Sequence, residues 1–133
     1  MEQELDFTAL ENLGVTDAML ADIKKTVKEL KEKNQNVKAI FPLVVQGNPA
    51  FDDKELYVGY FRQPDFKIFS KYLVGSAQNQ AGAMRQLARD SFLGGDKELI
   101  DDDSLFLFGL MGQLSKIIEI RNGALVTLSK TGK

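Results

Sequence analysis

The sequence predicts an α+β fold in which a β-hairpin packs against about three helices and follows an amino-terminal helical arm. Apolar residues recur at helical spacing in residues 17–33 and again in the second half of the chain. Two runs rich in β-branched and aromatic residues, 37–46 and 55–62, flank the turn-forming stretch "GNPAFDDK". No repeat or linker divides the 133 residues. We therefore predict a single domain, with residues 1–35 as the arm and 36–133 as the body.

The arm contains two predicted helices. A short one lies within "DFTALENLG", where Thr8 and Glu11 fit a capping box and Gly14 fits the position after a helix end. The second runs from about 17 to 33, with Thr16 as its N-cap. An amphipathic helix must bury its apolar stripe, either on its own body, which is favoured, or on a neighbouring chain. The stripe consists of Met19, Leu20, Ile23, Val27 and Leu30.

The hairpin carries two residues that constrain its geometry. Pro42 has no N–H to donate to a ladder, so we predict that it lies on an edge strand or at a bulge. Gly59 is predicted to mark a bulge in the second strand, because glycine within a strand often does.

Helical spacing returns after the hairpin. Pro64 and Asp65 favour a helix start, and the break at residues 75–79 separates this helix from a second one at about 80–92. Gly94 and Gly95 are predicted to stop the second helix. The first helix is predicted to carry Phe66, Phe69, Tyr72 and Leu73 on one face, with its phenylalanines in the core. The second is predicted to direct inward Met84, Leu87, Ala88 and Phe92.

A last helix is predicted to begin at Asp103 or Ser104, which would cap it, and to end near Ile120. The dipeptide Asn122–Gly123 then fits either a hairpin turn or a helix end followed by an extended tail, and the extended tail is favoured. The side chains predicted to face the core are Leu105, Phe108, Met111, Leu114, Ile117 and Ile118.

Composition argues against several function classes. The formal net charge of −2 and the lack of a basic stripe argue against nucleic-acid binding. The absence of cysteine and histidine removes disulfides, thiolate sites and the commonest general base. The longest apolar run falls far short of the ~20 residues that span a bilayer, and the amino end lacks an apolar signal region. We therefore expect no membrane interaction and a cytoplasmic site of synthesis.

The stretch "FLGGDKELIDDDSLFLFG", residues 92–109, is the strongest candidate for chemistry. A calcium loop needs oxygen ligands, a glycine and a glutamate at fixed positions, and registers starting at Asp96 or Asp101 both fail. We interpret the acids as a helix start, because unpaired N–H groups and the helix dipole favour negative charge there. Nucleophile and phosphate-loop motifs are absent from the sequence. No catalytic residue, cofactor or metal ligand is therefore predicted.

Two segments resemble a known family. "YVGYFRQPDFKIFSKYL" resembles a strand that ends in a turn with Pro-Asp and starts a helix. "LARDSFLGGDKELIDDDSLFLFGLMGQLSKIIEI" resembles the second half of the same proteins, in which a Gly-Gly-Asp turn, an acidic stretch and a Leu-Phe-Leu helix follow one another. These are small proteins of tailed-phage structural modules, especially in phages of Bacteroides and crAss-like phages. The resemblance covers residues 37–120, and the arm lies outside it.

The resemblance implies a non-catalytic bacteriophage virion or morphogenesis protein that acts by protein–protein binding. An auxiliary protein that decorates or cements the capsid is the first expectation. A tail-assembly chaperone that binds tape-measure or tail-tube subunits is the alternative, and a metal-binding protein or enzyme using the acidic loop is the rival from another class. Partners would be capsid or tail subunits, or a second copy. The protein would act in the host cytoplasm during assembly, and a decoration protein would stay in the virion.

Two surfaces are predicted to contact a partner. The arm offers its apolar stripe, and the first hairpin strand offers an edge with unpaired backbone groups. The arm residues are Met19, Leu20, Ile23 and Val27, and the hairpin residues are Pro42, Leu43, Val44 and Val45.

Overall fold

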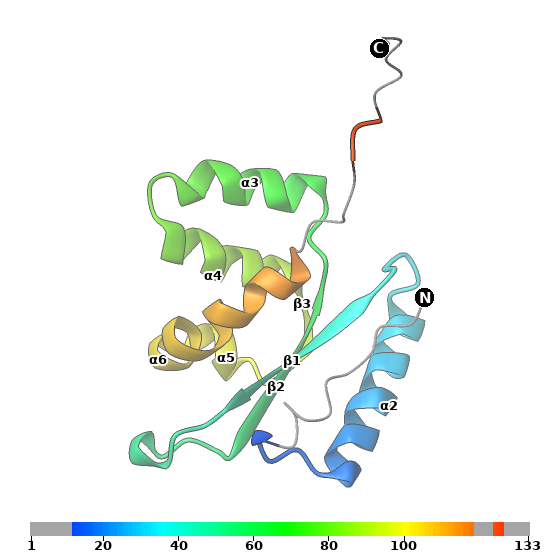
Figure 1. Ribbon diagram of the computed structural model, residues 1–133, viewed down its shortest axis with the longest axis vertical. Coiled ribbons are helices and arrows are strands. Elements are labelled where there is room, and N and C mark those ends of the chain that lie inside the picture. Colours follow the sequence, from blue (N-terminus) through cyan, green and yellow to red (C-terminus); the bar gives the residue numbers. More distant parts are fainter. Residues whose placement is uncertain (1–11, 119–123, 127–133) are drawn as a thin grey trace.

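The computed structural model describes residues 12–118 and 124–126, and it confirms the α+β class. A three-stranded antiparallel sheet lies between helix α2 on one side and the remaining helices on the other (Figure 1). The elements follow the chain in the order α2 (Asp17–Lys33), β1 (Ile40–Gln46), η1 (Pro49–Phe51), β2 (Leu56–Arg62), α3 (Phe66–Ser76), α4 (Gln80–Ser91), β3 (Phe92–Gly95), α5 (Glu98–Asp101), α6 (Asp103–Leu105), η2 (Phe106–Leu110) and η3 (Met111–Ile117).

The predicted hairpin is confirmed, and the sheet gains a strand that the sequence reasoning missed. β1 and β2 pair in an unbroken antiparallel register. β3 pairs with the other edge of β2, so the prediction that Gly94 and Gly95 stop a helix is wrong. α4 ends at Ser91 and the chain enters β3 directly. Gly95 has φ +105°, and a Cβ there would overlap the Val58 carbonyl oxygen, so this end of β3 requires glycine.

The bulge lies elsewhere than predicted. Gly59 pairs regularly with Leu43, and the irregularity falls between β2 and β3, where Leu93 has no partner in the register. Gly59 has a packing reason instead, because a Cβ there would lie 2.7 Å from a ring carbon of Phe61. Pro42 lies on β1, an edge strand of the sheet, as predicted.

The two faces of the sheet are both apolar and both covered. Side chains alternate between faces along a strand, so one strand can serve two cores. The main core gathers Leu43, Val45, Tyr57 and Phe61 with α4 and the carboxy-terminal helices. The second core gathers Ile40, Val44, Val58 and Tyr60 with α2.

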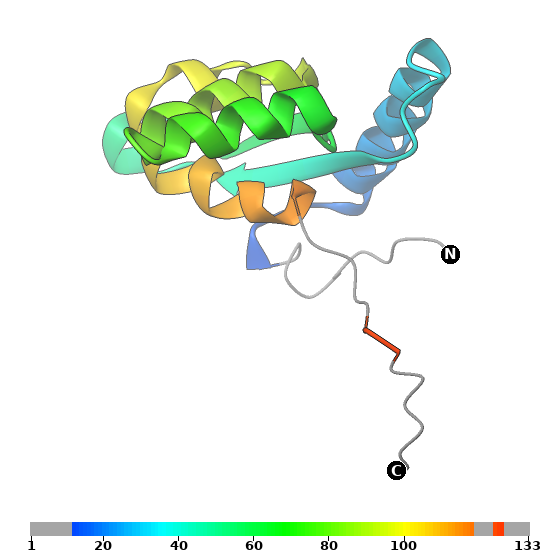
Figure 2. The ribbon, with the colours of Figure 1, turned by 90° about the horizontal axis from the view of Figure 1, so that it is seen from above.

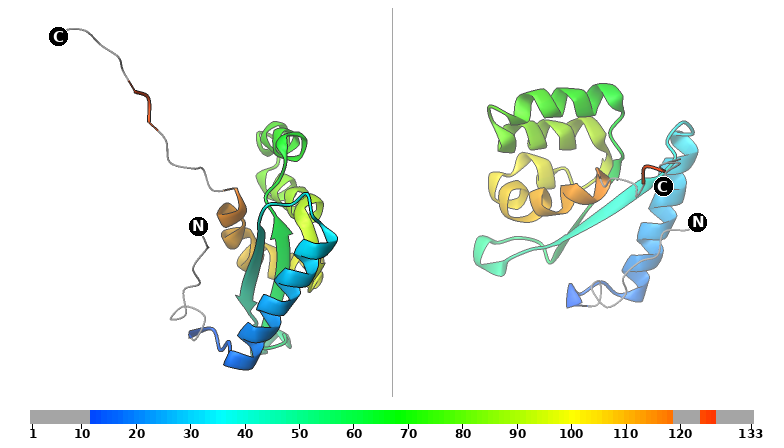
Figure 3. Two further views of the ribbon diagram at one scale, coloured as in Figure 1. Left: turned by 90° about the vertical axis from the view of Figure 1, so that its right-hand side faces the viewer. Right: turned by 45° about the horizontal axis from the view of Figure 1, so that its top comes forward.

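The predicted arm is packed on the body. Ile23 of α2 is buried against the sheet, together with the half-buried Val27 and Leu30. The helix starts where predicted, because the Thr16 hydroxyl accepts a hydrogen bond from the backbone N–H of Met19 at 3.2 Å. Figure 3 shows α2 lying along the strands. The short helix predicted within "DFTALENLG" falls mostly outside the described residues.

Helices α3 and α4 form an antiparallel pair on the main-core side, and α3 is the outer of the two (Figure 2). Asp65 caps α3 by accepting a hydrogen bond from the Ile68 N–H at 2.9 Å. An ion pair of 3.1 Å joins Lys71 of α3 to Asp90 of α4. The predicted core residues Met84, Leu87 and Ala88 are buried, whereas Phe92 belongs to β3 and is half-buried.

The last predicted helix differs from the prediction in its shape and in one core-facing residue. It consists of α6, a π-helical turn in η2 and a 3₁₀-helical stretch in η3 that ends at Ile117. Phe108 was predicted to face the core but is 87% exposed, whereas Phe106 and Leu110 are buried. A π turn shifts the face that a helix presents, and "LFLFGLMG" is apolar in either frame. Residues 124–126 have no regular secondary structure, and the rest of the predicted tail is outside the described residues.

Candidate functional site

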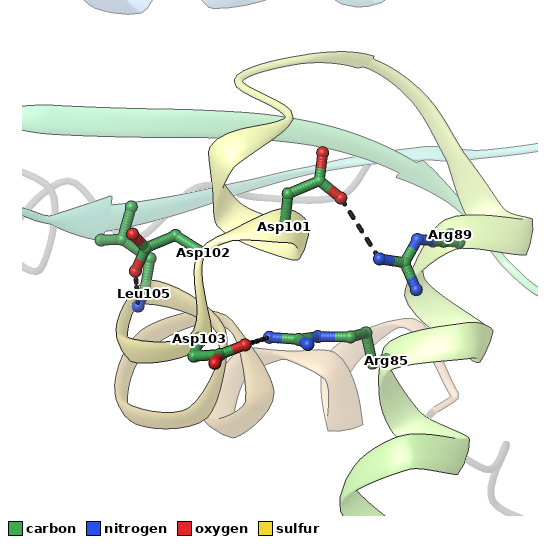
Figure 4. Close-up of polar contacts among 6 residues, drawn as sticks. All are labelled: Arg85, Arg89, Asp101, Asp102, Asp103 and Leu105. Atoms are coloured by element: carbon green, nitrogen blue, oxygen red, sulfur yellow. Dashed lines mark hydrogen bonds and ion pairs between the residues drawn. The ribbon is translucent and has the colours of Figure 1, made fainter.

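The acidic loop starts a helix, as the sequence interpretation held, but through a different residue. The Asp102 carboxylate accepts a hydrogen bond from the backbone N–H of Leu105 at 2.9 Å (Figure 4). Asp102 is therefore the N-cap of α6, and the prediction that Asp103 or Ser104 caps this helix is wrong. An N-cap needs an extended backbone, and Asp102 has φ −85° and ψ 124°.

The two neighbouring acids tie the loop to α4. Asp103 forms an ion pair with Arg85 at 2.7 Å, and Asp101 forms one with Arg89 at 3.3 Å (Figure 4). The Arg85 guanidinium also lies over the Phe106 ring, 5.1 Å from its centre. These pairs are exposed, so each contributes at most about 1 kcal/mol to stability. The three adjacent acids thus point to three different partners and do not converge on one point.

Asp96 joins β3 to the hairpin. Its carboxylate accepts a hydrogen bond from the backbone N–H of Val58 at 2.9 Å and a second one from Lys54 Nζ at 2.8 Å. The hydrogen bond with Asp96 raises the pKa of Lys54 above its usual 10.5. Asp96 thereby continues the β2–β3 ladder past the last residue of β3. Among residues 12–118 and 124–126, no three acidic side chains come together in a way that would hold a metal ion.

The predicted arm contacts are divided between the interior and the surface. Ile23 is buried under α2, and Leu20 and Val27 are half-buried. Met19 is 38% exposed and lies near the amino-terminal end of α2. Only Met19 therefore presents much of its side chain to a partner, and the others pack on the sheet.

The predicted hairpin contacts show a similar division. Leu43 and Val45 are buried in the main core, whereas Pro42 and Val44 are half-buried. β1 is an edge strand, so a contact here would use its outer backbone groups, with the side chains held in the two cores.

Helix α3 presents an apolar surface that the sequence reasoning missed. None of its eleven residues, all of them described, is buried, although six are large and apolar. Phe66 is 89% exposed, Leu73 56% and Val74 76%. The prediction that Phe66 packs in the core is therefore wrong, and Leu73, predicted on the same face, is exposed as well. We call Phe66, Phe69, Leu73 and Val74 the α3 surface.

A groove runs along part of the α3 surface. Its volume is about 320 Å³. Five of its eight lining residues are apolar. The lining residues are Gln63, Pro64, Asp65, Phe66, Phe69, Ser70, Leu73 and Ile118.

The exposure of α3 follows from its place in the fold. Its inner side packs on α4, and Tyr72 reaches the main core from that side. The Phe69 ring lies 5.5 Å from the Tyr72 ring on the same helix. The opposite side of α3 faces away from the sheet and from both cores (Figure 1). Contiguous exposed apolar residues typically mark a binding surface. Phe51 at the hairpin loop and Phe108 in η2 are also exposed.

One signal in the sequence points towards this surface without establishing it. In "FKIFSKYLVGS" apolar residues occupy positions on several sides of the helix, more than one packing face can bury. A helix of this kind is either enclosed by the fold or left with an apolar side exposed. The sequence alone does not show which, because exposure depends on the number of neighbouring elements.

Comparisons with known proteins add no identity: the chain matches no family model, no curated protein and no solved structure. None of the helices in the described ranges is both long and apolar enough to cross a bilayer.

Proposed function

We propose that this chain is a non-catalytic bacteriophage virion or morphogenesis protein that acts by protein–protein binding. Its first role would be that of an auxiliary protein that decorates or cements the particle. It would be made in the host cytoplasm and remain in the virion, with capsid or tail subunits as partners. The phage context comes from the sequence resemblance, and the binding role is supported by the α3 surface.

The observation that carries the binding role is the exposure of Phe66, Leu73 and Val74 on one helix beside a groove. A few residues near the centre of an interface supply most of its binding energy, and burial of apolar side chains is the main favourable term in association. The acidic loop supports the non-catalytic part of the proposal, because Asp102 caps a helix and Asp101 and Asp103 each form an ion pair.

The direct test is quantitative mass spectrometry of purified virions from the encoding phage. Many copies per particle are expected for an auxiliary structural protein. Absence from virions, together with binding to tape-measure or tail-tube subunits in lysates, would overturn the auxiliary role in favour of the tail-assembly chaperone.

A variant links the role to the α3 surface. The double change Phe66→Asp and Leu73→Lys removes two exposed apolar groups, preserves net charge and places each charge at the favourable end of the helix. Loss of this variant from particles is expected, whereas the control Lys67→Gln on the same helix should be incorporated normally. Equal incorporation of both would argue against α3 as the contact.

The rival class makes a different prediction. If the acidic loop held a metal, calorimetric titration with calcium or magnesium would show stoichiometric binding that Asp101→Asn and Asp103→Asn abolish. We expect no saturable heat in the micromolar range.

A further inference from the structure

The same chain carries an exposed apolar segment and an uncovered apolar groove. Leu125 is 91% exposed and Val126 is 75% exposed, within a stretch that has no regular secondary structure. The groove on α3 is lined by Phe66, Phe69 and Ile118 among others. Burying the segment in the groove would lower the free energy of both surfaces, because burial of apolar area is the main favourable term in association.

We propose that the α3 groove of one copy binds the Leu125–Val126 segment of a second copy of this chain. The inference deepens the proposed function and rests on its first step, that α3 is a protein-binding surface. It names the partner at that surface as another subunit of the same protein.

The groove suits an extended apolar peptide. A volume of about 320 Å³ can hold a pair of aliphatic side chains, and most of the lining residues are aromatic or aliphatic. Gln63 and Ser70 also line the groove, and their donors and acceptors can satisfy the backbone of an extended segment. The sequence "ALVTL" around Leu125 and Val126 is rich in residues that favour an extended conformation.

The geometry favours a second copy over the chain's own segment. Ile118, after which the chain leaves the last described helix, is itself part of the groove wall. Leu125 and Val126 are exposed in the single chain, so they lie outside its own groove, which is left open to the same segment of a second copy.

In the resulting contact, a groove on one subunit receives a segment of another. Reciprocal exchange of the two segments closes a dimer, whereas one-way exchange generates rings or open arrays. A single contact of this size is weak, but many copies held on one particle strengthen it through effective concentration.

Disulfide trapping tests the proposal sharply, because the chain has no natural cysteine. Leu73→Cys is introduced into one preparation and Val126→Cys into a second, which also carries an affinity tag. The two are mixed at about 1 mM subunit, where even weak contacts are populated. After mild oxidation, the mixed dimer is expected to exceed by about tenfold that of a control pair, Lys28→Cys with Val126→Cys. Lys28 is exposed on α2, away from the groove.

Two results would overturn the inference. One is a mixed dimer no more abundant than in the Lys28→Cys control. The other is efficient cross-linking of the double variant Leu73→Cys/Val126→Cys as a monomer without mixed dimers, which would assign the groove to the chain's own segment. If Phe66→Asp/Leu73→Lys is lost from particles while the mixed dimer is absent, the proposed function stands and only this inference fails. If the mixed dimer forms but the protein is absent from virions and binds no phage subunit, this inference stands and the proposed function fails.

Discussion

Helices α2 and α3 both carry apolar residues at helical spacing, but they use them differently. α2 places Ile23 against the sheet, where Tyr60 and Ile40 complete a small core. α3 leaves Phe66 and Leu73 exposed. The difference lies in position, since α2 lies on a sheet face and α3 lies outside another helix. An apolar stripe thus indicates that a helix needs a partner, and only the fold decides whether that partner is internal.

The largest expected effect tests this contrast directly. Ile23→Ala should lower the free energy of unfolding by about 2–4 kcal/mol, because it deletes buried methyl and methylene groups and leaves a cavity under α2. Leu73→Ala should change it by less than about 0.5 kcal/mol, because the side chain is half-exposed on α3. Urea unfolding followed by circular dichroism measures both. Similar losses for the two variants would show that the contrast is wrong.

The second effect concerns the sheet beneath α2. Asp96→Ala leaves the N–H of Val58 without its acceptor and should cost about 1–3 kcal/mol. Asp96→Asn keeps an acceptor and should cost less. Lys54→Met removes the exposed ion pair and the contact of the ammonium with the Tyr57 ring, and it should change stability by less than about 1 kcal/mol. Denaturant titrations compare the three, and an equal loss for Lys54→Met and Asp96→Ala would assign the role to the ion pair.

A smaller effect is expected at the start of each helix. Thr16→Ala and Asp65→Ala each remove an N-cap acceptor, worth about 1 kcal/mol. For Thr16 the loss should also weaken the packing of α2 on the sheet, whereas for Asp65 it should fray α3 alone. Amide hydrogen exchange distinguishes the two: faster exchange confined to α3 is expected for Asp65→Ala. Exchange that rises across the sheet in this variant would mean that α3 supports the core.

The smallest effect appears only in alkali. Burial raises the pKa of Tyr60 above its usual 10.0, and the hydrogen bond with Asp96 raises the pKa of Lys54 above 10.5. The unfolded chain therefore releases these protons first as pH rises, and stability falls from about pH 10 upward through the folded pKa values. Tyr60→Phe should make this decline shallower, whereas Leu73→Ala should keep it. Thermal unfolding between pH 8 and about pH 11 measures the slopes, and an unchanged slope in Tyr60→Phe would contradict the assignment.

Much of the fold could be predicted because local signals agreed with the final contacts. Thr16 and Asp65 cap the helices that their positions indicate, and the turn residues between the two β-prone runs close the hairpin. β3 was missed because its two glycines resemble a helix stop, and its pairing with β2 is a non-local contact. The face of the last helix was misjudged because Phe106 and Phe108 are equally apolar, so only packing selects between them.

The candidate site was harder to predict than the fold. Residues chosen as contacts for their apolar character, such as Leu43 and Val45, form the core, and Phe66, chosen as core, is exposed. Composition does not separate these cases, because a binding surface and a core use the same side chains. What separates them is the number of layers around each element, which only the assembled structure specifies.

The position of β3 in the chain also bears on the order of folding. β1 and β2 are consecutive, so the hairpin closes a short loop. The Asp96–Val58 hydrogen bond that holds β3 spans 38 positions, and Ile23 of α2 lies about as far along the chain from Tyr60, with which it shares the second core. Because long loops close more slowly, the hairpin is expected to order early, with α2 and β3 docking on β2 afterwards. Substitutions at Ile23 and at Asp96 should then both mainly speed unfolding.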